Sequence, residues 1–313
     1  MPSELSGAGR TVVVTGASRG LGLATAALLY RRGWHVLCAM RSPDNGLARF
    51  RSTIGEPLDE ARVTGVLLDL EDDSSIAQAA HTIQDMVGVP DGVVHNAGVA
   101  VAGCAEEIPL DIWKRLLQTN LLGPITLTNA LLPAMRARGQ GRFVVISRQG
   151  GIRGFPTISP YAASKSGLER WAEALAGEIA PFGLGVTVLI PGAFRTDILE
   201  VTQTFADPHG PYAELHTAIE TSGRRMIRLA RSVEKFAPAV ERALLDNAPF
   251  VRRPVGPDAV MLYYGNKLLP ARALHHGISK ALGLPRAGKL GRGSSTTPAR
   301  TRVGAASTGD PTS

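Results

Sequence analysis

Tyr161 and Lys165 are the residues of this sequence whose types and spacing best suit acid–base chemistry. They stand four positions apart where a helical pattern begins, and residues four apart lie on the same face of a helix. A lysine ammonium stabilises a neighbouring phenolate and lowers the pKa of a tyrosine from its usual value near ~10. Such a tyrosine can pass a proton to or from an alcohol or carbonyl oxygen near neutral pH. The pair alone is common, so the prediction depends on whether the chain also provides a nucleotide site.

A glycine-rich turn near the N-terminus is a candidate for that site. Residues 11–15 are a β-branched run, and Gly16, Gly20 and Gly22 follow it before an apolar helical pattern. Glycines allow a sharp turn and a close approach of backbone to ligand, and a helix N-terminus offers free N–H groups to a pyrophosphate. Because strand, turn and helix come in the required order, we predict a dinucleotide site rather than an ordinary connection.

Two arginines indicate which dinucleotide is preferred. Arg41 follows the second apolar run, near the place where an acidic residue in dinucleotide-binding folds holds the ribose 2′-hydroxyl. Arg19 lies within the glycine turn, and two guanidinium groups that converge on one phosphate can make bidentate contacts. A single surface arginine would mean little. Together, Arg19 and Arg41 favour NADP(H) over NAD(H).

The elements that must position these residues alternate between strand and helix. Strands are expected at about 11–15, 34–41, 62–70, 91–98, 141–147 and 185–192, with helices at about 72–87, 110–138 and 161–181 among those between them. This rhythm predicts an α/β fold, a doubly wound (Rossmann-type) parallel sheet with helices on both faces. Asn96, Ala97 and Gly98 end the fourth strand, where small residues leave room for a flat cofactor. Asn120 lies within the long helical pattern among leucines.

Composition fits one such domain and excludes other classes. The chain has 313 residues, 44% of them hydrophobic, with 35 glycines, which suits a parallel sheet joined by tight turns. Much of the net charge of +7 falls in residues 286–313, so the body is too weakly charged to imply a nucleic-acid partner. The two cysteines, Cys38 and Cys104, lack metal-type spacing, so no metal site and no disulfide framework is expected. No signal core or membrane-length apolar run occurs, so a cytoplasmic protein is expected.

Several motifs in register resemble the short-chain dehydrogenase/reductase family over about residues 10–250. They are Thr15-Gly16-x3-Gly20-x-Gly22, Asn96-Ala97-Gly98, Asn120, Tyr161-x3-Lys165 and Pro191-Gly192-x3-Thr196. The stretch from about 251 to 285 resembles the C-terminal extension of the hydroxysteroid and retinol dehydrogenase-like branch. The resemblance implies an enzyme acting on CH–OH groups, in which the nicotinamide cofactor transfers hydride and the protein manages the proton.

The resemblance also implies roles for individual residues. Tyr161 would be the general acid/base, Lys165 would bind the nicotinamide ribose and lower the Tyr161 pKa, and Asn120 would hold a water that relays protons from Lys165. Other cofactor contacts would come from the glycine turn and the end of the second strand, namely from Gly16, Ser18, Arg19, Gly20, Leu21, Gly22 and Arg41. Further contacts would come from Asp69 and Leu70 beside the adenine, from Asn96, Ala97 and Gly98 beside its ribose, and from Pro191, Gly192 and Thr196 beside the carboxamide and phosphates.

Position 148 departs from the family pattern. The family places a serine thirteen residues before the tyrosine, and Arg148 stands there. A bulge could bring the neighbouring Ser147 into the site, although adjacent strand residues face opposite sides. Arg148 could instead hold the substrate oxygen and stabilise negative charge on it. Catalysis could also be impaired, which would leave an NADP(H)-binding sensor or partner-binding protein. Because Asn120, Tyr161 and Lys165 are all present, we expect an active enzyme.

The segment after the last strand is expected to cover the substrate. Its apolar side chains, about half of which should only pack onto the body, are Ile198, Leu199, Val201, Phe205, Tyr212, Leu215, Ile219 and Met226. Together with the C-terminal extension, they favour a steroid-, retinoid- or lipid-like alcohol or ketone over a sugar. The extension could lie on a membrane surface, but packing over the substrate mouth is favoured.

The chain is thus expected to divide into one main domain with additions. These are an N-terminal arm (1–9), the NADP-binding and catalytic domain (10–256, with its lid at about 197–230), a helical extension (257–285) and a tail (286–313). The tail is rich in Gly, Ser, Thr, Ala, Pro and Arg, and we expect it to be disordered. Because family members commonly pair through their two long helices, we expect a homodimer through residues 110–138 and 161–181.

Overall fold

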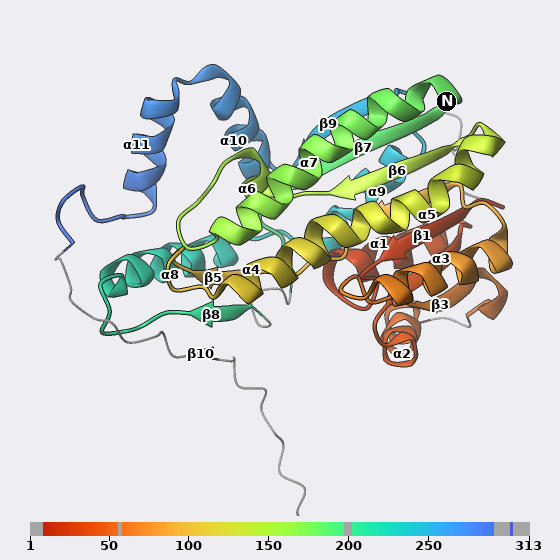
Figure 1. Cartoon of the computed structure of the whole chain (residues 1–313), viewed down its shortest axis with the longest axis horizontal. Coiled ribbons are helices and arrows are strands. Elements are labelled where there is room, and N and C mark those ends of the chain that lie inside the picture. Colours follow the sequence, from red (N-terminus) through yellow and green to blue (C-terminus); the bar gives the residue numbers. More distant parts are fainter. Residues whose placement is uncertain (1–8, 56–57, 197–201, 291–300, 303–313) are drawn as a thin grey trace, which may run out of the picture.

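The computed structural model describes residues 9–55, 58–196, 202–290 and 301–302. Within these residues, seven parallel strands form one sheet in the order β3-β2-β1-β4-β6-β7-β9 (Figure 1). Their bounds are β1 Thr11–Thr15, β2 His35–Met40, β3 Val63–Leu67, β4 Gly92–His95, β6 Gly141–Ile146, β7 Leu184–Pro191 and β9 Phe250–Val255. The six predicted strands are all present, and the parallel sheet that they predicted is confirmed.

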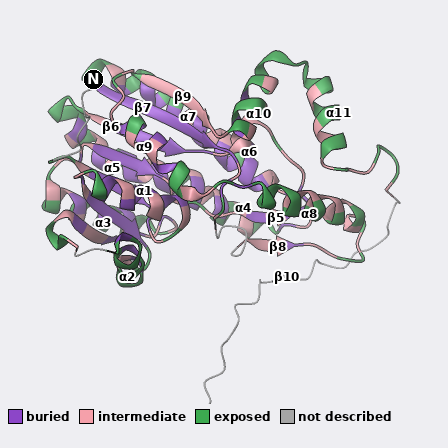
Figure 2. Ribbon diagram, turned by 180° about the vertical axis from the view of Figure 1, so that it is seen from behind, coloured by how far each residue is buried: buried purple, intermediate pink, exposed green. Residues whose placement is uncertain are grey.

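Helices cover both faces of this sheet. One face carries α3 (Asp73–Val87), α5 (Gly123–Arg138) and α7 (Ser159–Ile179), and the other carries α1 (Gly20–Arg31), α2 (Pro43–Ile54) and α9 (Ala237–Leu244) (Figure 1). Successive residues of a strand face opposite sides, so Val13 packs into the first layer while Val12 and Val14 pack into the second. Figure 2 shows the inner strands of the main sheet as largely buried. The doubly wound architecture therefore follows from continuous apolar strands that need cover on both sides.

Strand β9 was missed by the sequence pattern. All six of its residues are half-buried, and Arg252, Arg253 and Pro254 stand in its middle. Among the described strands it pairs with β7 alone, and it forms one edge of the main sheet. Edge strands commonly carry charges and proline because one of their hydrogen-bonding sides has no neighbouring strand. The polar composition that hid β9 is thus a consequence of its position.

The long helix expected at 110–138 contains a change of pitch. It consists of α4 (Leu110–Leu117), a π-helical turn (Gln118–Leu122) and α5. Asn120 is fully buried inside the π-helical turn. Such turns are frequent at functional sites because they re-aim a side chain and a carbonyl within an otherwise regular helix.

A smaller layer stands beside the main sheet. Strands β5 (Val101–Gly103), β8 (Gln203–Phe205) and β10 (Thr301–Arg302) form a three-stranded sheet, and helix α8 (Ala213–Arg228) follows β8. Of the expected lid residues, Phe205 is buried, Tyr212, Leu215 and Ile219 are half-buried, and Met226 is exposed. Ile198, Leu199 and Val201 lie outside the described residues.

The C-terminal extension forms the two helices α10 (Pro257–Leu268) and α11 (Ala271–Ala281). Helix α10 packs against β9 and against the short helix α6 (Gln149–Ile152), whereas α11 has no buried residue (Figures 1 and 2). Among the helices described, none combines the length and apolar content needed to cross a bilayer.

Two residues of the tail, for which disorder is expected, form the short strand β10. Thr301–Arg302 pair antiparallel with β8, whose open edge offers backbone partners to a passing segment. Residues 291–300 and 303–313, and residues 1–8 of the N-terminal arm, lie outside the described residues.

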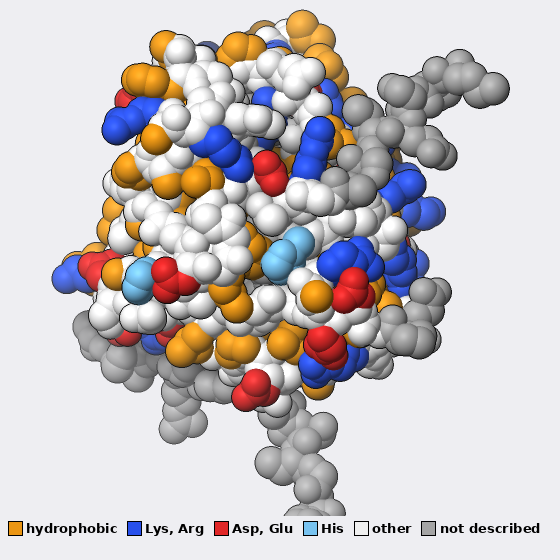
Figure 3. Space-filling model, turned by 90° about the vertical axis from the view of Figure 1, so that its right-hand side faces the viewer, with side chains coloured by type: hydrophobic (Ala, Val, Ile, Leu, Met, Phe, Trp, Pro, Cys, Tyr) orange, Lys and Arg blue, Asp and Glu red, His pale blue; other side chains and the backbone are white. Residues whose placement is uncertain are grey.

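The molecular surface carries charges of both signs. On the face shown in Figure 3, basic and acidic side chains lie interspersed with apolar ones. Mixed charges of this kind suit a solvated surface and provide no focused field for a polyanion on that face.

The tight packing of the glycine turn leads to a test of the fold. A Cβ at Gly22 would lie 2.2 Å from the carbonyl oxygen of Gly16, whereas a Cβ at Gly177 on α7 would meet nothing within 4 Å. Gly22→Ala should therefore lower the free energy of unfolding by about 1–3 kcal/mol through overpacking. The control, Gly177→Ala, should raise it by roughly 0.5–1 kcal/mol, since it relieves the helix of a glycine. Denaturant unfolding measures both, and equal stabilities would contradict this account of the turn.

Candidate active site

A cavity of about 310 Å³ opens at the carboxyl ends of the central strands. It lies where the strand order reverses between β1 and β4, the place at which open α/β sheets bind ligands. The predicted site residues in its wall are Gly16, Ser18, Arg19, Gly20, Leu21, Arg41, Asp69, Leu70, Asn96, Ala97, Gly98, Ser147, Arg148, Tyr161, Lys165 and Thr196. The remaining four, Gly22, Asn120, Pro191 and Gly192, stand outside that wall.

The glycine turn forms a cradle that excludes side chains. Gly16 adopts a left-handed φ of 67°, and a Cβ there would lie 2.8 Å from the Cα of Ala97. The turn is fixed to β2 by a hydrogen bond of 2.8 Å from the Gly16 N–H to the Ala39 carbonyl. Helix α1 begins directly after it at Gly20. Close backbone packing and a helix N-terminus at one point fit a pyrophosphate, so these residues fit a dinucleotide.

Asn96 braces this cradle from the neighbouring strand. Its Nδ2 donates to the carbonyl oxygens of Thr15 and Gly16 at 2.9 and 3.3 Å. The Thr15 hydroxyl accepts the N–H groups of Asn96 and Ala97 at 3.1 and 3.0 Å. The Asn96 side chain therefore holds the glycine turn, while the backbone of 96–98 forms the wall of the cavity.

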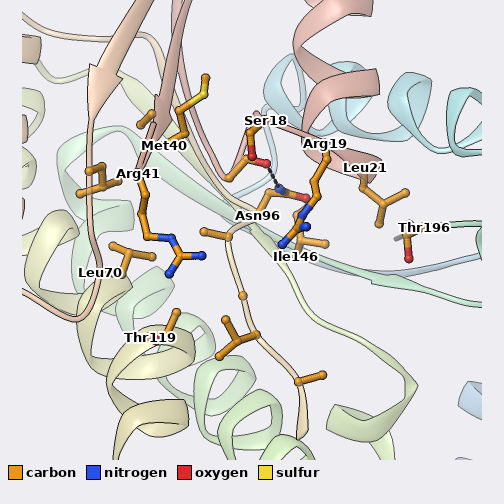
Figure 4. Close-up of a pocket in the computed structure, with 18 of the residues that line it drawn as sticks. Ser18, Arg19, Leu21, Met40, Arg41, Leu70, Asn96, Thr119, Ile146 and Thr196 are labelled. Carbon is orange, nitrogen blue, oxygen red and sulfur yellow. Dashed lines mark hydrogen bonds between the residues drawn. The ribbon is translucent and has the colours of Figure 1, made fainter. Parts of the chain in front are cut away.

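Arg19 and Arg41 extend their guanidinium groups into this cavity from two different elements (Figure 4). Arg19 immediately precedes α1, and Arg41 immediately follows β2. Asp69 also lines the cavity, but its carboxylate is engaged: Oδ1 accepts the Glu71 N–H at 3.0 Å. The two guanidinium groups, together with an Asp69 carboxylate that is bound to its own loop, suit the additional phosphate group of a phosphorylated dinucleotide.

Tyr161 and Lys165 lie side by side near the start of α7, and both are buried. The Lys165 Nζ donates to the Ile146 carbonyl at 3.1 Å and lies 6.0 Å from the centroid of the Tyr161 ring. Gly98 faces the same group, because a Cβ there would lie 3.4 Å from the Lys165 Nζ. The absence of a side chain at Gly98 thus keeps the lysine accessible from the cavity.

Burial and Arg148 control the ionisation of this pair. Burial raises the pKa of Tyr161, and the charge and hydrogen bond of Arg148 oppose that rise. The pKa of Lys165 falls to about 8, mainly through burial and then through the charge of Arg148, with Glu169 acting in the opposite direction. The cation that favours the Tyr161 phenolate here is Arg148, a role that the resemblance assigned to Lys165.

The neighbours Ser147 and Arg148 point to different partners. The Ser147 hydroxyl donates to Oε1 of Glu169 at 2.5 Å, and the other oxygen of Glu169 accepts from Arg252. Arg148 reaches into the cavity and donates weakly to the Gly192 carbonyl at 3.4 Å. Both residues follow the end of β6 at Ile146 and both line the cavity, but the Ser147 hydroxyl is engaged by Glu169, whereas Arg148 acts on Tyr161.

Asn120 is bound by its protein neighbours. Its Oδ1 accepts the Val99 N–H at 2.8 Å, and its Nδ2 donates to the Val99 carbonyl at 2.9 Å and to the Ser164 hydroxyl at 3.1 Å. These bonds join the π-helical turn to the segment after β4 and to α7. The side chain therefore positions the elements that carry Gly98 and Lys165.

Two acidic residues that sequence reasoning missed support the site from behind. Asp258, in the first turn of α10, accepts the Ala193 N–H at 2.7 Å and Nε2 of Gln149 at 3.3 Å, which fixes the turn that follows β7. Glu169 lies one helical turn beyond Lys165 and is buried. The four-residue spacing of Lys165 and Glu169 was visible in the sequence, but such pairs are usually solvated.

Comparison with known proteins agrees with this geometry. A family model described as short chain dehydrogenase matches residues 10–206. The chain is 32% identical to the uncharacterized oxidoreductase YbbO of Escherichia coli, over 85% of this chain and 92% of that protein. It is 30% identical to retinol dehydrogenase 5 of Mus musculus, over 84% of this chain and 86% of that protein.

Solved structures show the same fold. A short-chain dehydrogenase from Streptomyces avermitilis superposes with a TM-score of 0.72 at 30% identity, covering 89% of this chain and 96% of the other. A gluconate 5-dehydrogenase-like protein from Beutenbergia cavernae, described with bound NADP, superposes with a TM-score of 0.64 at 32% identity, covering 82% and 98%.

The cradle at the strand reversal, the tyrosine–lysine pair beside it and the similarity over most of the chain lead to one conclusion. The protein belongs to the short-chain dehydrogenase/reductase family and is an oxidoreductase that uses a nicotinamide dinucleotide to act on CH–OH groups.

Proposed function

We propose that the protein is an NADP(H)-dependent enzyme that interconverts a hydrophobic secondary alcohol and its ketone. The proposal rests on one observation above all: a single cavity is lined both by the buried Tyr161–Lys165 pair and by Arg19 and Arg41. The first pair suits proton transfer to an oxygen, and the second suits a phosphorylated dinucleotide.

Each residue has a defined task in this reaction. The bound cofactor would supply the hydride chemistry. Tyr161 donates its proton to the substrate oxygen when a ketone is reduced and takes it back when an alcohol is oxidised. Arg148 holds that oxygen and stabilises the negative charge that develops on it. Lys165 is positioned by the Ile146 carbonyl to bind the nicotinamide ribose. Because the Asn120 amide is engaged, a relay water would use the backbone of its π-helical turn.

The preference for NADP(H) is inferred from the charge of the cavity. Arg19 and Arg41 offer two guanidinium groups where an acidic residue would favour NAD(H). The Beutenbergia cavernae structure, described with bound NADP, belongs to a protein of similar fold and supports the same choice.

The preference for a hydrophobic substrate is inferred from the surroundings of Tyr161. Its ring packs in an apolar cluster with Val101, Ile108, Leu116 and Phe205. The name of the similar retinol dehydrogenase 5 agrees with a steroid-, retinoid- or lipid-like alcohol or ketone. Pairing of two copies through α5 and α7 also stays a prediction, which a mass measurement in solution would test.

A catalytically weak NADP(H)-binding protein is the second candidate. It is favoured by one observation, the engagement of the Ser147 hydroxyl by Glu169, which leaves Arg148 at the place of the family serine. In that case the cavity would bind the dinucleotide for sensing or for partner binding. The behaviour of Arg148 variants separates the two candidates.

Cofactor affinity tests the role of Arg41. Arg41→Ala should weaken NADPH binding by about 1–3 kcal/mol, the range for a charge-assisted hydrogen bond, and should leave NADH binding nearly unchanged. Arg49→Ala, which removes an exposed arginine of α2 outside the cavity wall, is the control and should change neither affinity. Calorimetric titration with both dinucleotides measures the effect. Equal affinity of the parent protein for NADPH and NADH would show that the arginines do not select the cofactor.

A kinetic series tests the catalytic assignment. Tyr161→Phe should abolish turnover of hydrophobic ketones while NADPH still binds. Arg148→Ser should lower kcat by ~10²–10³ if Arg148 holds the substrate oxygen, and should raise it if Arg148 marks impaired catalysis. Ser147→Ala should leave kcat nearly unchanged. A large loss of kcat in that variant would show that Ser147, and not Arg148, holds the substrate oxygen. Absence of turnover in the parent protein, with NADPH binding intact, would favour the sensor.

The pH profile tests how Arg148 acts on Tyr161. Ketone reduction needs protonated Tyr161, so its rate should be constant at low pH and fall as the pH rises through the Tyr161 pKa. Because Arg148 lowers that pKa, Arg148→Ser should move the fall to higher pH. Arg148→Lys keeps the charge and should move it less. An alkaline limb at the same pH in all three proteins would contradict this coupling.

A further inference from the structure

A second cluster of chemically active side chains lies away from the cofactor cavity. The Sγ of Cys104, a carboxylate oxygen of Glu107 and a ring nitrogen of His216 all lie within 4.8 Å of one another. Cys104 is buried, and the side chains of Glu107 and His216 are only 9% and 17% exposed. None of the three lines the cofactor cavity. The cluster joins the segment after β5 to α8.

The central carboxylate is held in place by backbone groups. The Glu107 Oε2 accepts the Cys104 N–H at 2.9 Å and lies 2.6 Å from Nε2 of His216. Its Oε1 accepts the Asp207 N–H at 3.4 Å, from the loop after β8. Hydrogen bonds of this kind orient carboxylate ligands in metal sites and keep their lone pairs directed at the ion.

The charge around the thiol is negative. Burial and the carboxylates of Glu107 and Glu106 raise the pKa of Cys104 to about 12. The hydroxyl of Tyr212 shares a hydrogen bond with Glu106 on the same side. The Glu107 carboxylate and the thiol thus adjoin the imidazole of His216, and Glu106 adds negative charge near the thiol, an environment that attracts a divalent cation. A bound cation reverses the effect on the thiol, because a coordinating thiol is deprotonated.

We propose that Cys104, Glu107 and His216 form a zinc site that fastens α8 to the body of the enzyme. Thiolate sulfur, imidazole nitrogen and carboxylate oxygen are the three donor types that Zn²⁺ binds in proteins, and the sulfur disfavours Mg²⁺ and Ca²⁺. Three protein ligands leave the fourth tetrahedral position to a water. On binding, the Cys104 thiol releases its proton to solvent, and neutral His216 carries its hydrogen on Nδ1, so that Nε2 and the Glu107 carboxylate both offer lone pairs to the ion.

The geometry requires a modest adjustment. Zinc–nitrogen and zinc–oxygen bonds of about 2.0–2.1 Å in a tetrahedron place two ligand atoms roughly 3.3 Å apart. Nε2 of His216 and Oε2 of Glu107, now 2.6 Å apart, therefore have to separate slightly. Small side-chain rotations provide that separation while Glu107 keeps its two backbone donors.

The site gives α8 an anchor that its packing does not provide. No residue of α8 is buried, and a helix with so little buried surface belongs to the easily opened parts of a protein. His216 lies in its first turns, eleven residues after the buried Phe205 that packs beside Tyr161. Zinc at this point would hold the expected substrate lid in one position. Cysteine spacing alone predicts no metal site, because His216 lies more than one hundred residues after Cys104 in the sequence.

Metal titration of the full-length, tag-free protein tests the proposal. After removal of metals with a chelator, the protein should bind one equivalent of Zn²⁺ in competition with a chromophoric chelator and should release protons as it does so. Co²⁺ in place of Zn²⁺ should give a thiolate-to-cobalt charge-transfer band. Zn²⁺ should also raise the melting temperature of the parent protein.

Matched variants assign the ligands. His216→Gln should weaken Zn²⁺ binding by about 100-fold or more, a loss at least as large as those seen for outer-shell partners, and should cancel the thermal shift. His209→Gln removes an exposed histidine of the same segment and should bind Zn²⁺ like the parent. Cys104→Ser should remove the charge-transfer band. If Cys104→Ser does not fold, His216→Gln and the cobalt spectrum of the parent still decide.

Two results would overturn the proposal. One is uptake of less than about a tenth of an equivalent of Zn²⁺ by the parent protein, at Zn²⁺ concentrations that saturate the competing chelator. The other is undiminished binding by His216→Gln. Neither result bears on NADPH binding, which uses a different cavity, so the zinc site and the proposed oxidoreductase activity fail or succeed separately.

Discussion

The burial of the Lys165 ammonium is the constraint on which the active site depends. A buried charge is costly unless hydrogen bonds and an opposite charge compensate it. Here the Ile146 carbonyl accepts from Nζ, and the buried Glu169 carboxylate supplies the opposite charge one helical turn away. Glu169 in turn needs partners, which it finds in Ser147 and Arg252. The contacts that compensate the lysine charge therefore extend from α7 to Arg252 on the edge strand β9.

This network also explains the arrangement at the end of β6. The Ser147 hydroxyl is engaged by the buried Glu169 carboxylate, and the charged side chain that follows β6 into the cavity is Arg148. Burial raises the pKa of Tyr161 and lowers the pKa of Lys165, and the neighbouring Arg148 guanidinium opposes the first shift and adds to the second. The site thus places a buried tyrosine beside two cationic side chains in one cavity, where the two like charges repel each other. Binding of an anionic dinucleotide relieves that repulsion.

The C-terminal part of the chain contributes side chains that hold the site in place. Strand β9 contributes Arg252 to the network behind Lys165, and α10 contributes Asp258, which holds the turn after β7. Helix α11 and much of α8 are held by far less packing. The molecule therefore has a well-packed part, built on the sheet, and a part formed by α8 and α11 that buries few side chains. Enzymes with covering segments commonly divide their stability in this way.

Sequence alone determined the parts of this protein that depend on local pattern. Apolar runs of five to eight residues bounded by glycine turns, as in the strands at 11–15 and 184–191, are typical of buried parallel strands. The glycine turn and the Tyr161–Lys165 spacing are likewise local, so the cradle and the buried tyrosine–lysine pair beside it were predictable. Most of the predicted cavity residues follow strand ends, and a parallel sheet gathers those ends at one edge.

Only the tertiary structure decided what depends on which side a residue faces and what it meets there. Ser147 donates to Glu169, which lies twenty-two residues further along the chain, and Glu169 also accepts from Arg252 on the edge strand β9. Strand β9 had no apolar pattern because edge strands do not need one. Cys104, Glu107 and His216 come together because α8 returns to β5, over a separation that no spacing rule covers. Side-chain partners across such distances are selected by packing and charge compensation, which a one-dimensional pattern does not record.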